Sequence, residues 1–237
     1  MEAPLLEWFR ANGRDLPWRR TRDPYAILVS EVMLQQTQVA RVIPRWRDWL
    51  ARWPTVEALA AAPLADVIRA WQGLGYNRRA VSLHRAAVRV AAEGWPDDLT
   101  ELPGVGRYTA DAVAAFARGS DVLPVDTNVR RVLERTGGSF GPRAAQALFD
   151  LGASVCLARI PRCGACPLAR ECPSRGRRYE PLRKQGPLAG SFRERRARTL
   201  RLVSHHERPL DALDREAVEA LARDGLVLIH ETTVALP

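Results

Sequence analysis

The sequence predicts a mainly α-helical protein, and two patterns within its first 160 residues support this prediction. Helix start signals, Asp23 with Pro24 and also Thr55, precede apolar segments. Apolar residues recur at three- and four-residue intervals, as in the stripe Trp46, Trp49, Leu50 and Trp53. We interpret this stripe as core packing rather than as an exposed stacking surface. In this region only residues 122–125 are typical of a strand.

Composition and charge narrow the class of protein. A chain of 237 residues with 46% hydrophobic content can bury the core of one or two domains. The sequence has no apolar run of about eighteen residues and no signal-peptide pattern near Met1, so we expect a cytoplasmic, nucleoid-associated protein with no membrane partner. A net charge of +9 favours a polyanionic partner such as nucleic acid, with a merely basic surface as the alternative.

The helix that begins at Pro24 is expected to bury an apolar face around Glu31. Further helices are predicted over residues 63–71 and from about Arg79 to about Ala92. The stretch Gly73-Leu74-Gly75-Tyr76 interrupts the pattern between them.

Residues 102–110 form a glycine-rich stretch, Leu-Pro-Gly-Val-Gly-Arg-Tyr-Thr-Ala, before an apolar helix that is expected to start at Thr109. Pro103 ends the preceding segment, and Gly104 and Gly106 allow a tight hairpin with unshielded amides. Amides at a helix N-terminus attract anions such as a DNA phosphate. A plain turn between packed helices is the alternative.

The cysteines lie within one short stretch with the spacing C-x6-C-x2-C-x5-C: Cys156, Cys163, Cys166 and Cys172. Disulfides are disfavoured in a cytosolic protein, and thiolates this close together need a cation. Zinc sites usually present two C-x2-C pairs, whereas this stretch has one. A structural 4Fe–4S cluster is therefore favoured over the alternative, a zinc ion.

The composition changes after the cysteines. Residues 191–237 predict two helices, near Glu194–Ser204 and Asp211–Ala222, and a final hairpin of Leu226–Ile229 with Thr232–Ala235, which together suggest a small winged-helix-like module. The expected organisation is helical lobes over residues 1–155 with a helix-hairpin-helix at about 99–118, a cluster loop over 156–173, a basic linker over 174–190 and the tail over 191–237.

Three of these features together resemble the helix-hairpin-helix DNA glycosylases of the endonuclease III and MutY superfamily: the Leu-Pro-Gly-Val-Gly hairpin, Asp126 about twenty residues later, and the cysteine spacing. Residues 31–39, Glu-Val-Met-Leu-Gln-Gln-Thr-Gln-Val, narrow the resemblance to the MutY adenine glycosylases, as do Leu16-Pro17-Trp18-Arg19 and residues 73–76. The resemblance covers roughly residues 5–173. It implies a two-lobed helical fold in which a flipped base enters between the lobes.

The resemblance also implies roles for individual residues. Glu31 corresponds to the acid that protonates adenine, and Asp126 to the carboxylate that faces the sugar. Tyr108 and Asn128 correspond to supporting polar residues. The residues implied at the duplex are Gln36, Thr37, Tyr76, Gly104 and Gly106, of which Gln36 and Tyr76 wedge into it, and those implied in the base pocket are Trp18, Arg19 and Asp150. The hairpin amides are expected to hold the DNA backbone together with a bound monovalent cation.

The sequence departs from the family pattern in three places. Asn77 stands where a second tyrosine is common, and the segment between Arg135 and Ala145 is short. The smaller tail stands in place of the large C-terminal domain that reads 8-oxoguanine in typical MutY proteins.

The chemistry of breaking an N-glycosidic bond requires two carboxyl groups in opposite roles. Desolvation in an apolar helix would raise the pKa of Glu31 and keep it protonated as an acid, with an exposed or capping glutamate as the alternative. Asp126 begins a helix whose amides and dipole favour the anion. A base inside the duplex reaches these groups only after it is flipped out.

The expected function is a monomeric glycosylase that acts on double-stranded DNA and releases adenine mispaired with 8-oxoguanine or guanine. A thymine or uracil mismatch glycosylase on the same scaffold is the first alternative, and a non-catalytic DNA-binding iron–sulfur protein is the second. Bifunctional relatives use a lysine where this chain has Tyr108, and the only lysine here is Lys184, so we expect base release without strand cleavage.

Overall fold

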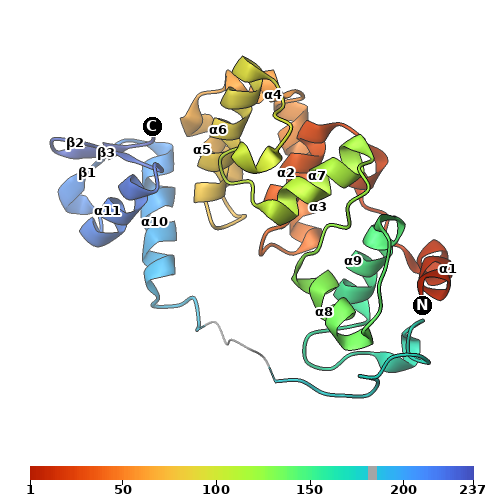
Figure 1. Cartoon of the computed structure of the whole chain (residues 1–237). Coiled ribbons are helices and arrows are strands. Elements are labelled where there is room, and N and C mark those ends of the chain that lie inside the picture. The colour runs from red at the N-terminus through yellow and green to blue at the C-terminus, as the bar shows by residue number, and fades with distance from the viewer. Residues whose placement is uncertain (181–185) are drawn as a thin grey trace. The chain divides into compact units, whose positions relative to one another are not determined.

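The computed structural model describes residues 1–180 and 186–237, and it confirms the mainly helical fold class (Figure 1). Part of the predicted linker, including Lys184, lies outside the described residues. The helices are α1 (Glu2–Asn12), α2 (Pro24–Leu34), α3 (Val39–Arg52), α4 (Val56–Ala60), α5 (Leu64–Trp71), α6 (Arg78–Glu93), α7 (Arg107–Arg118), α8 (Thr127–Thr136), α9 (Ala145–Ser154), α10 (Phe192–His205) and α11 (Arg215–Arg223). Within the described residues, no helix is both long and apolar enough to cross a membrane.

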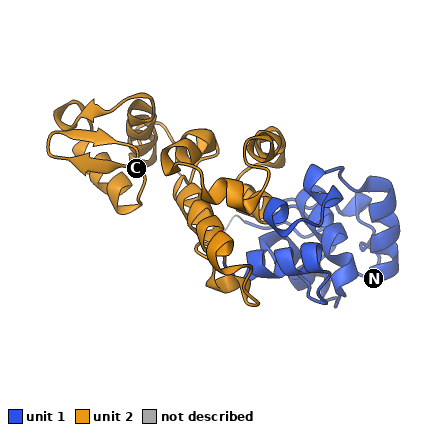
Figure 2. Cartoon of the chain, turned by 90° about the horizontal axis from the view of Figure 1, so that it is seen from above, with its two compact units in different colours: residues 1–27, 106–184 blue, residues 28–105, 185–237 orange. Residues whose placement is uncertain are grey.

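The chain divides into two compact units, which Figure 2 shows in different colours. Unit 1 comprises residues 1–27 and 106–184, and unit 2 comprises residues 28–105 and 185–237. Each unit is therefore built from two segments that are distant in the sequence.

Local capping explains where the helices begin. The carboxylate of Asp23 accepts hydrogen bonds from the amides of Tyr25 (3.0 Å) and Ala26 (3.3 Å), as the predicted start of α2 requires. The hydroxyl of Thr55 accepts from the amide of Ala58 in the same way at α4. Helix α7 begins at Arg107 rather than at the predicted Thr109, because the extended residue Gly106 is its N-cap.

The predicted strand at residues 122–125 is wrong, because the structure shows no strand there. Pro124 has no amide hydrogen to donate to a sheet, which explains the difference. The segment instead leads into Asp126, the N-cap of α8.

Each unit has a core of its own. In unit 1, α1, α8 and α9 pack around Leu5, Val132 and Leu148, and Leu168 from the cluster loop joins this core. In unit 2, the ring of Trp49 lies 4.7 Å from that of Trp53 and 5.4 Å from that of Trp71 in edge-to-face contacts. The tryptophans of the stripe are 2–8% exposed, so the prediction that they form core is confirmed.

The tail combines α10 and α11 with a three-stranded antiparallel sheet in the order β1-β3-β2. Its strands are β1 (Arg208–Pro209), β2 (Leu228–His230) and β3 (Thr233–Ala235). The second helix begins at Arg215, later than predicted, because Leu210–Ala212 forms a 3-10 turn and Asp214 caps α11.

The tail shares a core with the helical part of unit 2. Leu200 and Val203 of α10 are buried in one apolar cluster with Ile68 of α5 and Val81 of α6. The backbone carbonyl of Ser204 accepts a hydrogen bond of 2.9 Å from Nε of Arg69. The tail is thus packed on α5 and α6 and belongs to the same unit.

Candidate functional site

Glu31 lies in the middle of a fully buried helix segment. Residues 25–33 of α2 are all buried, and Glu31 is 6% exposed between Ser30 and Val32. A helix that is apolar on all sides is expected to be buried, and α2 fits this rule except for its one carboxyl group. The alternative of an exposed or capping glutamate does not describe this position.

Asp126 is the N-cap of α8, as the sequence predicted. Its Oδ1 accepts a hydrogen bond of 2.6 Å from the amide of Val129, and its Oδ2 accepts one of 2.9 Å from Nδ2 of Asn128. These two hydrogen bonds hold the carboxylate at the N-terminal end of α8. Asp126 belongs to unit 1, whereas Glu31 belongs to unit 2.

Arg131 holds Asn128 in place, a role that the sequence analysis missed. Its Nη2 donates to Oδ1 of Asn128 (2.7 Å) and to the carbonyl of Gly152 (2.7 Å), and its Nε donates to the carbonyl of Cys156 (2.8 Å). Burial lowers the pKa of Arg131 from its ordinary value. The only sequence signal was the three-residue spacing from Asn128, which places both side chains on one face of α8.

Close packing between α8 and α9 supports this arrangement. A Cβ atom at Gly152 would lie 2.8 Å from Cβ of Asn128, so only glycine fits at this point of α9. Tyr108, in the first turn of α7, packs its ring edge-to-face against that of Phe149 on α9, with 6.2 Å between the ring centroids. The two supporting residues predicted from the resemblance therefore both contact α9.

The hairpin before α7 requires glycine at position 104, whereas a Cβ atom at Gly106 would meet no other atom of the described residues within 4 Å. Gly104 has φ +77°, and a Cβ atom there would lie 2.6 Å from Cβ of Ser82. Val105 closes the turn, its amide donating to the carbonyl of Leu102 at 3.1 Å. Gly106 has no side chain to cap the first amides of α7. These are the features of an anion-binding helix start.

Gln36 and Tyr76 lie in two turns of unit 2, one that follows α2 and one that precedes α6. Both are exposed, Tyr76 by 47%. The hydroxyl of Thr37 lies within 3.3 Å of the carbonyl of Leu74 and links the two turns. The structure therefore brings these three predicted duplex residues together. It also shows a residue that the sequence reasoning missed, Arg79, between the same turns.

Trp18, Arg19 and Asp150 lie together in unit 1. Asp150 is 1% exposed, and its carboxylate accepts four hydrogen bonds of 2.7–2.9 Å from Arg14 and Arg19. Burial acts to raise the pKa of Asp150, but the hydrogen bonds from Arg19 and Arg14 outweigh it, and the pKa lies below its ordinary value. Trp18 is buried nearby at 7% exposure. A base-pocket role for these residues stays a prediction, since the carboxylate already binds two arginines.

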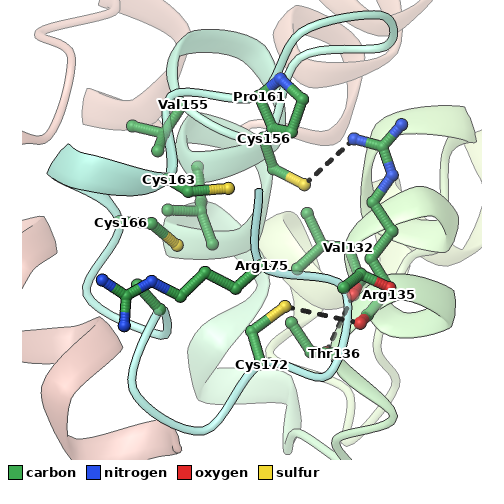
Figure 3. A pocket seen from close by; sticks show the side chains of 13 residues that line it. Val132, Arg135, Thr136, Val155, Cys156, Pro161, Cys163, Cys166, Cys172 and Arg175 are labelled. Carbon is green, nitrogen blue, oxygen red and sulfur yellow. Dashed lines mark hydrogen bonds between the residues drawn. The ribbon is translucent and has the colours of Figure 1, made fainter. Parts of the chain in front are cut away.

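The cysteine side chains line one pocket, into which their sulfur atoms point (Figure 3). The amide of Gly176 donates to Sγ of Cys163 (3.3 Å), and Nη1 of Arg135 lies 3.6 Å from Sγ of Cys156. Burial, with the neighbouring thiols, raises the pKa of Cys166, so a bound cation would be needed to hold its thiolate. Among the described residues, no group of three or more His, Cys, Asp or Glu side chains is arranged to hold a metal ion.

Comparison with known proteins places these features in a family context. A model of the HhH-GPD superfamily of base excision DNA repair proteins matches residues 29–151. The adenine DNA glycosylase of Mycobacterium tuberculosis is 43% identical over an alignment of 273 positions, which covers 95% of this chain and 90% of the relative. The human adenine DNA glycosylase is 39% identical over 227 residues, covering 79% of this chain and 42% of the relative.

Solved structures show the same fold. A thermostable thymine-DNA glycosylase matches with a TM-score of 0.65 and 27% identity, covering 73% of this chain and 93% of that chain. An endonuclease III captured as a covalent intermediate with DNA matches with a TM-score of 0.63 and 24% identity, covering 73% of this chain and 92% of that chain. At this identity the second likeness concerns the fold alone.

Proposed function

The chain belongs to the HhH-GPD superfamily of base excision DNA repair proteins, and from this premise we propose that it hydrolyses the N-glycosidic bond of mispaired adenine in double-stranded DNA. The observation that carries the proposal is the contrast between two carboxyl groups. Glu31 is buried in the apolar helix α2, and Asp126 is hydrogen-bonded at the start of α8. A general acid and its anionic partner require two different environments, one that favours a protonated carboxyl group and one that favours a carboxylate.

In the proposed reaction, Glu31 donates its proton to the adenine ring and so makes the base a better leaving group. The sugar then develops positive charge, and the carboxylate of Asp126 stabilises it. Asn128 and Arg131 keep that carboxylate in one orientation through the hydrogen bonds described above. Tyr108, in the first turn of α7, acts as a further supporting polar residue for this carboxylate. A water molecule completes the hydrolysis.

DNA is held and opened by other residues in this proposal. The hairpin of Gly104 and Gly106 binds a phosphate through backbone amides, together with a monovalent cation, and carries no sequence information. Gln36 and Tyr76 enter the duplex where the adenine leaves it. The protein acts as a monomer in the nucleoid-containing cytoplasm.

A 4Fe–4S cluster bound by Cys156, Cys163, Cys166 and Cys172 is part of the proposal. Four cysteines around one pocket are a suitable ligand set, and the Gly176 amide and the Arg135 guanidinium are placed to donate to sulfur. The cluster, when bound, supplies a cross-link for the loop and a negative charge beside Arg135. The side chains of the loop itself, such as Arg159, Arg162 and Arg170, then face a phosphate backbone.

A thymine or uracil mismatch glycosylase is the second candidate function. The structural likeness to a thymine-DNA glycosylase, at 27% identity and over 93% of that chain, favours keeping it. Residues 31–36, Glu-Val-Met-Leu-Gln-Gln, favour adenine.

A panel of duplexes tests the function directly. Each duplex carries a single mispair: adenine opposite 8-oxoguanine, adenine opposite guanine, thymine opposite guanine, or uracil opposite guanine. We expect release of adenine from the first two, with an intact abasic strand that breaks only on heating in alkali. Release of thymine or uracil alone would support the second candidate, and binding without any base release would support a non-catalytic protein. Efficient borohydride trapping would contradict the expected lack of strand cleavage.

A further inference from the structure

Two turns of unit 2 carry backbone strain. Among the non-glycine residues that the structure describes, only Gln36 (φ +55°) and Tyr76 (φ +48°) have positive φ angles. This conformation costs an L-residue roughly 1–2 kcal/mol, so neighbouring groups must hold it. In the proposed function, these are the two residues that insert into the duplex as a wedge. The strain therefore lies where the duplex is to be opened.

One side chain contacts both turns. Arg79 lies in the first turn of α6, and its Nη2 donates to the carbonyl of Gly75 (2.9 Å) and to the hydroxyl of Thr37 (3.3 Å). Its Nε donates to the carbonyl of Tyr76 itself (3.3 Å). The guanidinium thus joins the turn that follows α2 to the turn that precedes α6.

The same guanidinium also reaches the end of α2. Its Nη1 donates to the carbonyl of Val32 and, at 3.2 Å, to that of Met33. These carbonyls lie in the last turn of α2, where backbone carbonyls have no amide of the same helix to accept from. Val32 directly follows Glu31, so Arg79 binds the helix end that carries the proposed acid as well as both turns.

The surroundings of Arg79 explain why arginine is needed. The guanidinium lies 5.3 Å from the ring centroid of Trp71 and 5.6 Å from that of Tyr76. Burial lowers the pKa of Arg79 to about 10, with the nearby Tyr76 opposing this, and the group stays charged at neutral pH. Its planar fork has five N–H donors directed at acceptors in three segments, whereas a lysine has three donors on one atom.

We propose that Arg79 is a positioning residue for base extrusion, which fastens the two strained turns together so that Gln36 and Tyr76 enter the duplex as one rigid unit. The inference rests on the proposed function, since that function makes these two residues the wedge. It goes further in naming what holds them. Arg79 acts through the two turns and through the end of α2.

The test uses the full chain and a duplex with 2-aminopurine, a fluorescent adenine analogue, opposite guanine. Its fluorescence rises when the base leaves the stack, whether or not the bond is then cut. Arg79→Lys keeps the charge, and we expect it to lower the fluorescence rise on this duplex by about tenfold, about 1.4 kcal/mol. On a second duplex with adenine opposite guanine, the single-turnover rate of adenine release should fall by the same factor. Arg78→Lys, at the exposed neighbouring arginine, is the matched control and is expected to stay within about twofold of the unmodified protein.

A second background separates positioning from general stability. When Tyr76→Ala has already removed the tyrosine of the wedge, Arg79→Lys should change the remaining fluorescence rise by less than about twofold, since residues that act through one another are not additive. A full effect of Arg79→Lys in that background would show a general structural role and overturn the inference. An unchanged fluorescence rise in the single variant Arg79→Lys would overturn it as well.

Two further outcomes keep the test decisive. If Arg79→Lys is unfolded at the assay temperature, Thr37→Val replaces it, because it removes only the hydroxyl between the turns; we then expect the same pattern at smaller amplitude, and no change would overturn the inference. If the unmodified protein unstacks 2-aminopurine but releases no base, the proposed function is contradicted. The effect of Arg79→Lys on the fluorescence rise would still test the positioning role. One that binds the duplex without unstacking the base would overturn the inference.

Discussion

The helices that carry the two proposed catalytic carboxyl groups differ in how they hold them. Helix α2 surrounds Glu31 with buried apolar residues, whereas α8 gives Asp126 a backbone amide and the side chain of Asn128 as hydrogen-bond donors. Apolar burial favours the neutral form of a carboxyl group, and hydrogen-bond donors favour its anion. In the proposed mechanism, unit 2 therefore carries the proton donor and unit 1 carries the carboxylate that stabilises the sugar cation.

The largest expected effect follows from removing either carboxyl group. Glu31→Gln and Asp126→Asn should each slow single-turnover base release by at least about 10²-fold, the lower range for general acid–base catalysis. Duplex binding should stay nearly intact, because phosphate contacts supply most of the affinity. Rapid-quench assays with DNA bound to excess protein measure the rate, and near-normal rates for either variant would contradict the mechanism.

A matched control separates the chemistry of Asp126 from its capping role. Asp214 caps α11 with the same geometry, its Oδ1 accepting from the amide of Ala217 at 3.0 Å. Asparagine caps a helix about as well as aspartate, so Asp126→Asn and Asp214→Asn should each cost less than about 1 kcal/mol, even though Asp214→Asn also removes the charge that pairs with Arg195. Only Asp126→Asn should stop base release.

The cluster loop provides the next effect, which should fall on unit 1 alone. The purified protein is expected to contain iron and acid-labile sulfide in a brown 4Fe–4S centre. Cys163→Ser should lower solubility or DNA affinity more than the rate of the chemical step, since the loop holds arginines rather than catalytic groups. Elemental analysis and single-turnover rates measure both, and stoichiometric zinc in protein prepared with and without oxygen would contradict the assignment.

The third effect is a pH dependence that should also be confined to unit 1. The pKa of Asp150 lies below its ordinary value of 3.8, so the carboxylate stabilises the folded state above that pH and loses this contribution as the pH falls below it. Asp150→Asn should therefore lower the free energy of unfolding at pH 7 by about 2 kcal/mol, with the difference from the unmodified protein shrinking below pH 3.8. Hydrogen exchange should show the loss in α9 before α2. A constant difference at all pH values would contradict this account.

The features that sequence could predict are those with local causes. The Asp126 cap depends on an aspartate before a helical pattern, and the burial of Glu31 depends on its apolar neighbours in α2. The strand predicted at residues 122–125 was wrong, because Pro124 has no amide hydrogen to donate to a neighbouring strand.

The arginines that position the site could not be predicted. Arg79 donates to the carbonyl of Val32, 47 positions earlier, and Arg131 donates to that of Cys156, 25 positions later. Every residue has a backbone carbonyl, so such contacts leave no residue-type pattern in the sequence. Only the fold decides which carbonyls face a guanidinium.

The smallest expected effect concerns the tail, in which α10 exposes arginine side chains to solvent. Arg195 is paired with Asp214 at 3.0 Å and Arg196 with Asp224, whereas Arg198 and Arg201 are exposed. Phosphate contacts bind DNA without reading bases. The double variant Arg198→Gln, Arg201→Gln should therefore weaken binding to all duplexes alike by a few-fold and flatten the salt dependence by roughly one unit of slope per lost contact.

Specificity should hardly change in this double variant. The ratio of rates on adenine opposite 8-oxoguanine and opposite guanine should move by less than about tenfold. At the end of α10, Ser204 is 5% exposed and hydrogen-bonded to Gln72, whereas the next two residues, His205 and His206, are exposed. Arg195→Gln serves as the control, because it breaks an ion pair within the tail and should leave the salt dependence unchanged. A selective loss of activity on the 8-oxoguanine duplex would show that the tail reads the opposite base, and it would direct the next substitutions to these two histidines.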